Sequence, residues 1–104
     1  MINNTVAPLE LTDSMAVKII RECVDRGRVI FTHHATERMV QRNIDRAQVF
    51  DCLRKGTVKE PAYRNIKGSW QITLERVSTG QTVTVPVGIS YATEETKAVI
   101  ITVY

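Results

Sequence analysis

Three side chains that can act on a phosphate group recur at four-residue intervals in the first half of the chain: His34, Arg38 and Arg42. Residues four apart share one face of an α-helix, so this spacing predicts a stripe carrying one imidazole and two guanidinium groups. Ala35 and Met39 fall beside that stripe and are suited to contact a core. The segment therefore predicts a short helix with a basic, titratable face next to a buried one.

These residue types suit cleavage of RNA without a metal ion. The ribose 2′-hydroxyl can attack the adjacent phosphorus when a base removes its proton, an acid protonates the leaving 5′-oxygen and cations stabilise the phosphorane. His34 is the candidate base or acid, and Arg38, Arg42 and Lys59 can hold the phosphate. A solvated helix surface or a structural network is the commoner reason for such residues, so spacing alone does not decide the function.

Other catalytic chemistries lack their residues in this sequence. His33 and His34 are adjacent, which points their side chains about 100° apart on a helix, and no Asp or Glu is spaced to complete a metal site. Cys23 and Cys52 fall at expected core positions, so neither a thiolate nucleophile nor a disulfide is expected. The sequence has no Gly-rich phosphate loop and no Gly-x-Ser-x-Gly elbow. We therefore expect neither a metal nor a cofactor.

Three helices and several strands must position these residues. Caps and apolar spacing predict helices from Thr12 or Asp13 to about Arg26, from His33 after the N-cap Thr32, and from Asp45 to Lys55, the last with an Asp45/Gln48 capping box and a stop at Gly56. Apolar or alternating segments predict strands over residues 28–32, 57–63, 69–77, 82–91 and 97–104. Pro61 favours an edge position for the second of these strands, and Pro86 a bulge or an edge in the fourth.

This order of elements predicts an α+β domain in which the N-terminal helices pack on one face of a C-terminal antiparallel sheet. With 104 residues and 43% hydrophobic content, the chain fits a single domain over 1–104, with a loosely held arm over 1–11. The apolar final strand is suited to the sheet centre, with Tyr104 at its end. No membrane span and no signal peptide are predicted, so a cytoplasmic location is expected.

The positive charge gathers in the middle of the chain. The formal net charge is +3, and eleven of the 14 Lys and Arg residues lie between Arg21 and Lys67, whereas only Arg76 and Lys97 follow. Such a distribution is compatible with an anionic partner, either a nucleic acid or an acidic protein. Arg42, Lys59 and Arg64 are the basic residues that we assign to RNA binding.

The histidine segment also carries a recognisable pattern, Thr32-x-His34-Ala35-x-Glu37-Arg38-Met39-x-x-Arg42-x-Ile44. It resembles the signature of a family of small bacterial domains of unknown function, which is similar to the RelE-type toxin superfamily and to the MqsR messenger-RNA interferases. Trp70-Gln71 and Thr79-Gly80-Gln81 resemble the strand hairpin of the MqsR-like enzymes. Together the resemblance covers about residues 12–104 and implies a RelE-like, microbial-RNase-like fold.

The resemblance also implies site residues. In the MqsR-like family, the Gln after the Trp and a Lys before it belong to the active site, which implies roles for Gln71 and Lys59. The family's catalytic Tyr has no counterpart, because residues 82–84 read Thr-Val-Thr, and the Lys of its final strand falls at Tyr104. With His34 and Arg38 from the helix, the candidate catalytic set is His34, Arg38, Gln71 and Tyr104.

The leading hypothesis is a toxin-like, metal-independent endoribonuclease, an mRNA interferase of a toxin–antitoxin pair. Its partners would be RNA, a cognate antitoxin protein and, in a ribosome-dependent variant, the ribosome. The alternative is a noncatalytic module that binds RNA or an acidic protein through the same face. Both predict salt-sensitive binding, and only catalysis predicts a pH optimum and ends bearing a cyclic or 3′-phosphate.

Overall fold

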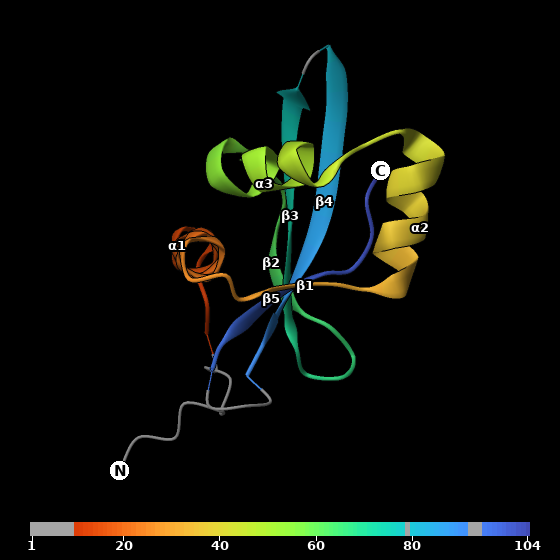
Figure 1. Ribbon diagram of the computed structural model, residues 1–104. Helices are drawn as coiled ribbons and strands as arrows, with labels where there is room; N and C mark the ends of the chain where they lie inside the picture. Colours follow the sequence, from red (N-terminus) through yellow and green to blue (C-terminus); the bar gives the residue numbers. More distant parts are fainter. Residues whose placement is uncertain (1–9, 79, 92–94) are drawn as a thin grey trace.

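The computed structural model describes residues 10–78, 80–91 and 95–104, which form three helices and five strands (Figure 1). The elements in order are α1 (Asp13–Asp25), β1 (Val29–Phe31), α2 (His33–Arg42), α3 (Arg46–Lys55), β2 (Thr57–Arg64), β3 (Trp70–Ser78), β4 (Gln81–Ser90) and β5 (Lys97–Ile100). Most of the expected arm, residues 1–9, lies outside the described residues, as do Thr79 of the Thr-Gly-Gln motif and residues 92–94. The fold class is α+β, as the sequence predicts.

The five strands form one mixed sheet in the order β1-β5-β4-β3-β2. β2, β3, β4 and β5 pair antiparallel, but β1 pairs parallel with β5, with Ile30 opposite Val99. The expectation of a purely antiparallel sheet is therefore wrong at this edge. All elements from α2 to β4 lie between β1 and β5 in the chain, which gives the crossover connection that parallel strands need. The last strand is interior to the sheet, although β4 is its middle strand.

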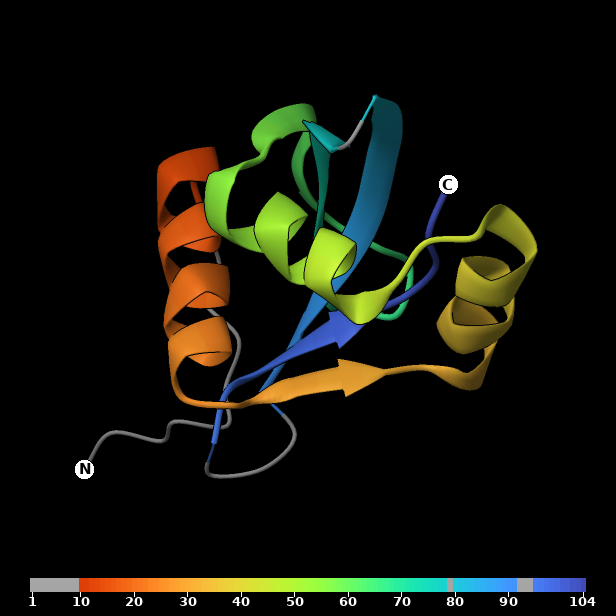
Figure 2. The same ribbon diagram turned by 45° about the horizontal axis from the view of Figure 1, so that its top comes forward.

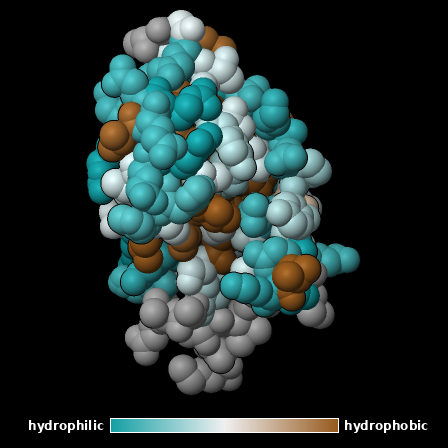
Figure 3. All heavy atoms as spheres, turned by 90° about the vertical axis from the view of Figure 1, so that its right-hand side faces the viewer, coloured by the Kyte–Doolittle hydropathy of each residue, from teal (hydrophilic) through white to brown (hydrophobic). Residues whose placement is uncertain are grey.

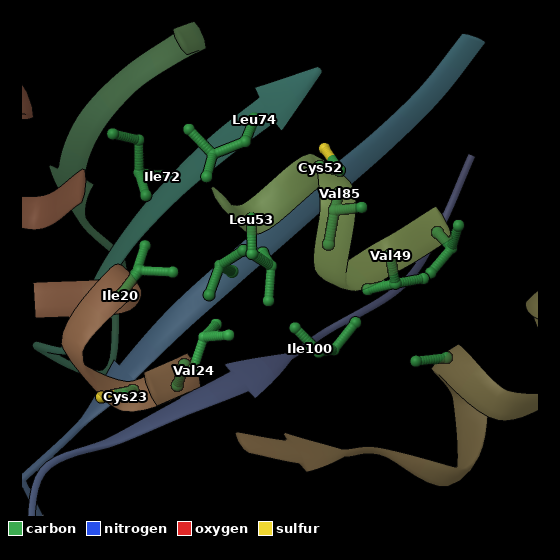
Figure 4. Close-up of a cluster of buried hydrophobic side chains, with 14 of the residues drawn as sticks. Ile20, Cys23, Val24, Val49, Cys52, Leu53, Ile72, Leu74, Val85 and Ile100 are labelled. Carbon is green, nitrogen blue, oxygen red and sulfur yellow. The ribbon is translucent and has the colours of Figure 1, made fainter. Parts of the chain in front are cut away.

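Two of the helices cover one face of the sheet. In Figure 1 the sheet is seen nearly edge-on, with α1 and α3 on one side and α2 apart from them. Figure 4 shows the core between α1, α3 and the strands, where Ile20, Leu53 and Ile72 are fully buried. α2 lies instead next to the segment after β5 (Figure 2), so the expectation that all helices share one face is wrong.

Residues 101–104 continue along β4 after β5 ends, and we call them the C-terminal segment. The amide of Ile101 donates to the carbonyl of Pro86 at 3.1 Å, whereas Thr84 and Tyr104 exchange two backbone hydrogen bonds of 3.1 and 2.8 Å. Two residues of the C-terminal segment therefore lie opposite the single residue Val85. This two-against-one pairing is a β-bulge. The predicted strand 97–104 is interrupted by this bulge. Pro86 lies beside it in the central strand, and not at an edge of the sheet.

The face of the sheet away from α1 and α3 is formed by alternate residues of β3 and β4, and we call it the open face. It carries three cross-strand pairs: Gln71 opposite Gly88, Thr73 opposite Pro86, and Glu75 opposite Thr84. Their neighbours Ile72 and Leu74 point into the core, which fixes the direction of the alternation. Figure 3 views the molecule from this side and shows hydrophilic side chains around a hydrophobic centre.

Candidate functional site

Thr32 anchors the start of α2. Its hydroxyl oxygen accepts a hydrogen bond from the amide of Ala35 at 3.0 Å, which is the predicted N-cap. The same hydroxyl lies 2.8 Å from the carbonyl oxygen of Ile100 and 3.0 Å from that of Ile101, to which its proton can be donated. One side chain therefore caps the helix and ties it to the C-terminal segment, which brings His34 and Arg38 beside the end of the chain.

Arg38 and Tyr104 meet across this junction. The guanidinium carbon of Arg38 lies 5.8 Å from the centre of the Tyr104 ring, within the range of a cation–π contact. Tyr104 is directly opposite Thr84, and residues paired in this way point to the same face, so its side chain lies on the open face. The sequence-predicted residues Arg38 and Tyr104 are thus brought together, although 66 positions separate them in the chain.

His34 is exposed one helical turn before Arg38. Among the residues that the structure describes, it makes no hydrogen bond or ion pair, so its imidazole is available to a ligand. The adjacent His33 behaves differently: its side chain is 90% exposed and its Nε2 lies 3.7 Å from a carboxylate oxygen of Glu37. His34 therefore lies on the stripe with Arg38, as its spacing predicts, and His33 does not.

The other end of α2 is held by Gln81. The side-chain amide of Gln81 donates to the carbonyl oxygen of Arg42 at 3.0 Å, and Gln48 donates to the Gln81 carbonyl oxygen at 3.3 Å. Asn43 ends the helix in the left-handed conformation, with a φ of 54°, which Asn tolerates better than most residues. The side chain of Arg42 remains exposed at the end of the stripe.

A second polar cluster occupies the row of the open face that ends at Tyr104. A carboxylate oxygen of Glu75 lies 3.1 Å from the Lys59 ammonium and accepts a hydrogen bond of 2.8 Å from the Thr84 hydroxyl. The Thr84 hydrogen bond and then the Lys59 contact lower the pKa of Glu75 from its ordinary value. Lys59, assigned to RNA binding from the sequence, is thus already paired. Glu75 and Thr84 were not predicted, and alternation along both strands is the signal that could have placed them.

Gln71 and Arg64 lie away from this cluster. Gln71 is on the open face four residues before Glu75, a separation of about 13 Å along a strand. Arg64 is opposite Trp70, which is buried, and its guanidinium lies 3.4 Å from the carbonyl oxygen of Gly68 in the loop after β2. The predicted catalytic set therefore divides into His34, Arg38 and Tyr104 in one place and Gln71 in another. Arg64, which was assigned to RNA binding, lies in neither place.

Both cysteines are buried, as expected. Burial raises the pKa of the Cys52 thiol to about 12, and it also raises the pKa of Cys23. Their sulfur atoms lie 3.6 Å and 3.4 Å from the carbonyl oxygens of Val83 and Thr96. Neither thiol is in a state to act as a nucleophile.

Among the described ranges, no three His, Cys, Asp or Glu side chains gather closely enough to hold a metal ion, and no helix is long and apolar enough to cross a membrane. A groove of about 740 Å³ lies between α2 and α3, lined by residues that include Met39, Val40 and Gln48. None of the seven predicted site residues lines this groove. The candidate site is therefore an open surface around α2 and the C-terminal segment, and not an enclosed pocket.

Residues 31–104 match the family described as "Domain of unknown function (DUF4258)". This is well over half of the chain. The protein belongs to the DUF4258 family. No curated protein and no solved structure matches the sequence.

The DUF4258 match begins at Phe31, at the end of β1. It includes α2, the open face and the C-terminal segment, and so contains all seven predicted site residues. α1 lies before it, although Ile20 and Val24 of that helix are part of the buried core. The part of the chain that defines the DUF4258 family is thus the part that builds the candidate site.

Proposed function

We propose that this DUF4258 protein is a toxin-like endoribonuclease, a metal-independent mRNA interferase of a toxin–antitoxin pair that acts in the cytoplasm. The observation that carries the proposal is the contact of Arg38 with Tyr104, one helical turn from the unpaired His34. An imidazole, a guanidinium and a phenol on one accessible surface are the groups that metal-free RNA cleavage needs. The resemblance to RelE-type and MqsR-like toxins, and a RelE-like arrangement of the fold, belong to this proposal.

In the proposed reaction, Arg38 binds the scissile phosphate. Its guanidinium can donate two parallel hydrogen bonds to phosphate oxygens, and contact with the Tyr104 ring holds it in place before RNA binds. The Tyr104 hydroxyl, which is on the same face, supplies a further donor to the phosphate. Arg42, one turn beyond Arg38, contacts the next phosphate along the strand.

His34 carries the proton transfer. As a base it removes the proton of the 2′-hydroxyl, whose oxygen then bonds to phosphorus while the bond from phosphorus to the 5′-oxygen breaks. The leaving oxygen takes a proton from a protonated group or from water, and the products carry a 2′,3′-cyclic phosphate and a 5′-hydroxyl. Lys59 is a weaker contributor than the sequence suggests, because its charge is largely balanced by Glu75.

The test compares wild type, His34→Ala and His33→Ala on a mixed single-stranded RNA in the presence of EDTA. His33 is the matched control, because it is the same residue type on the same helical turn and lies off the Arg38 stripe. We expect cleavage by wild type and by His33→Ala, with cyclic-phosphate ends, and a loss of at least about 100-fold in His34→Ala. Equal loss in both variants, or undiminished cleavage by His34→Ala, would remove His34 from the mechanism.

The proposed antitoxin would cover the exposed guanidinium groups of α2 with acidic side chains. Co-purification of the native protein with a small acidic partner, and release of that partner by salt, are the expected results. The ribosome enters as a partner if wild type cuts RNA only when translating ribosomes are added. If the native protein purifies without any small partner, the toxin–antitoxin part of the proposal is wrong, although the nuclease part can stand.

A second candidate function is a noncatalytic module that binds RNA or an acidic protein. It is favoured by the isolation of His34, which contacts no second acid or base among the described residues and so has no preformed proton relay. This module would bind single-stranded RNA with a steep salt dependence, and His34→Ala would leave that binding almost unchanged. Binding without cleavage, both with and without ribosomes, would select it.

A further inference from the structure

The end of the open face farthest from Tyr104 carries two large exposed side chains that the proposed reaction does not use. Tyr63 on β2 is 46% exposed and lies directly opposite Gln71, so its ring and the Gln71 amide are neighbours on the open face. Ile66, in the loop that joins β2 to β3, is fully exposed. In Figure 1 this loop bends to the same side of the sheet as α2, so the open face lies between the two.

Hydrogen bonds fix the conformation of this loop. The side-chain oxygen of Asn65 accepts hydrogen bonds from the backbone amides of Lys67 at 2.9 Å and Ser69 at 3.1 Å. The backbone amide of Asn65 donates to the Ser69 carbonyl at 2.8 Å. Gly68 completes the turn with a φ of 81°, in the region that glycine favours. Ile66 is therefore held outward by a closed turn, so a ligand can contact it without first ordering the loop.

A flat aromatic ring beside a carboxamide is the combination that recognises an unpaired nucleobase. The ring offers a face on which any base can stack, and the amide offers a donor and an acceptor for the base edge. The β2–β3 loop also carries Lys67, whose positive charge suits a polyanionic chain. A paired base in a duplex exposes neither its face nor its Watson–Crick edge, so these features select single strands.

We propose that Tyr63, Gln71 and the β2–β3 loop form a subsite for an unpaired base of single-stranded RNA, separate from the phosphate site at Arg38. The inference rests on the proposed function for its ligand class. The Gln71 row is about 13 Å along the strand from the row of Glu75 and Tyr104. The bound base therefore belongs to a nucleotide that flanks the cleaved linkage, and Gln71 acts in recognition and not in proton transfer.

The test measures binding, so that it does not depend on cleavage. A labelled hexanucleotide with 2′-O-methyl on every ribose, which has no attacking hydroxyl, is titrated with wild type, Tyr63→Ala, Tyr63→Phe and Met15→Ala by fluorescence anisotropy. Met15 is the control, because it is a similarly exposed hydrophobic residue on α1. We expect Tyr63→Ala to bind about 5-fold to 100-fold more weakly, and the other two variants to bind like wild type.

A second series removes one base at a time from the hexanucleotide. At one position, loss of the base should weaken binding by wild type as much as the Tyr63→Ala substitution weakens binding of the intact hexanucleotide. Loss of the same base should not weaken binding by Tyr63→Ala any further, and this non-additivity indicates direct contact. Thermal melting of Tyr63→Ala checks that the edge strand is intact.

If Tyr63→Ala binds the hexanucleotide as tightly as wild type does, the subsite is wrong, whether or not wild type cleaves RNA. Tyr63-dependent binding without cleavage, both with and without translating ribosomes, would support the subsite and exclude the nuclease. If wild type binds no RNA at all, the subsite is wrong. The proposed function is then decided separately, by the cleavage assay with and without translating ribosomes.

Discussion

Replacement of Thr32 by valine tests how α2 is attached to the rest of the molecule. Valine has nearly the same shape as threonine but lacks the hydroxyl that accepts from Ala35 and donates to Ile100 or Ile101. Loss of the N-cap costs about 1 kcal/mol, within a range of about 0.5 to 2. Loss of the hydroxyl donor to a partly buried carbonyl adds about 1 to 3 kcal/mol.

The two contributions together predict that Thr32→Val lowers the free energy of unfolding by about 2 to 4 kcal/mol. This is a large part of the stability of about 5 to 15 kcal/mol typical of a small domain. Since 1 kcal/mol shifts the melting temperature of such a domain by about 4 to 8 °C, a decrease of roughly 10 °C or more is expected. Urea titration followed by fluorescence of Trp70, which is buried, measures the change.

Thr32→Ser is the matched control, because serine keeps the hydroxyl and is a good N-cap. We expect its free energy of unfolding to lie within about 1 kcal/mol of wild type. If Thr32→Val were as stable as wild type, the hydrogen bonds of the Thr32 hydroxyl would contribute nothing to the free energy of unfolding. If Thr32→Ser were as unstable as Thr32→Val, the methyl group and not the hydroxyl would explain the loss.

Three further predictions concern the α3–β2 region and the open face. Glu75→Gln should destabilise the protein at neutral pH. Because the folded-state pKa of Glu75 is lowered, the ionised carboxylate contributes stability above the ordinary pKa of 4.5, and this stability is lost as the pH falls below that value. The free energies of unfolding of the two proteins, measured by urea titration, should therefore converge at low pH. Gly56→Ala should cost about 1 to 3 kcal/mol in urea titration, because the new Cβ would collide with the Cys52 carbonyl oxygen and lie 3.1 Å from that of Glu75. Cys52 should resist iodoacetamide at pH 8 in the native protein and react once urea unfolds it, since burial raises its pKa to about 12; rapid native labelling would contradict the burial.

Features set by neighbouring residues are predictable from this sequence. Asp45 and Gln48 form the expected capping box at the start of α3, with hydrogen bonds of 2.8 and 3.0 Å. Thr32 caps α2 as predicted, and of the two caps predicted for α1 the structure shows Thr12. Such caps depend on side chains within three residues of the helix end, so their pattern can be identified before the fold is known.

Features set by distant residues are not predictable in the same way. β1 has only three residues, and nothing in Val29–Phe31 indicates that its partner is β5 or that the pairing is parallel. The contact of Arg38 with Tyr104 depends on that pairing, because β1 leads directly into α2. The stripe on α2 could therefore be predicted, whereas the aromatic ring beside it was assigned only through a resemblance.

Pro86 shows how one residue links these two levels. Ile101 donates to the Pro86 carbonyl, but proline has no N–H to return the bond, so the Ile101 carbonyl lacks its usual partner on β4. The Thr32 hydroxyl lies 3.0 Å from that carbonyl and can take the place of the missing donor. A proline in the central strand thus leaves the Ile101 carbonyl oxygen without a backbone donor at the point where α2 begins. The hydroxyl of the N-cap residue Thr32 supplies a donor there. The sequence predicts an irregularity at Pro86, but only the structure connects it to the position of His34 and Arg38.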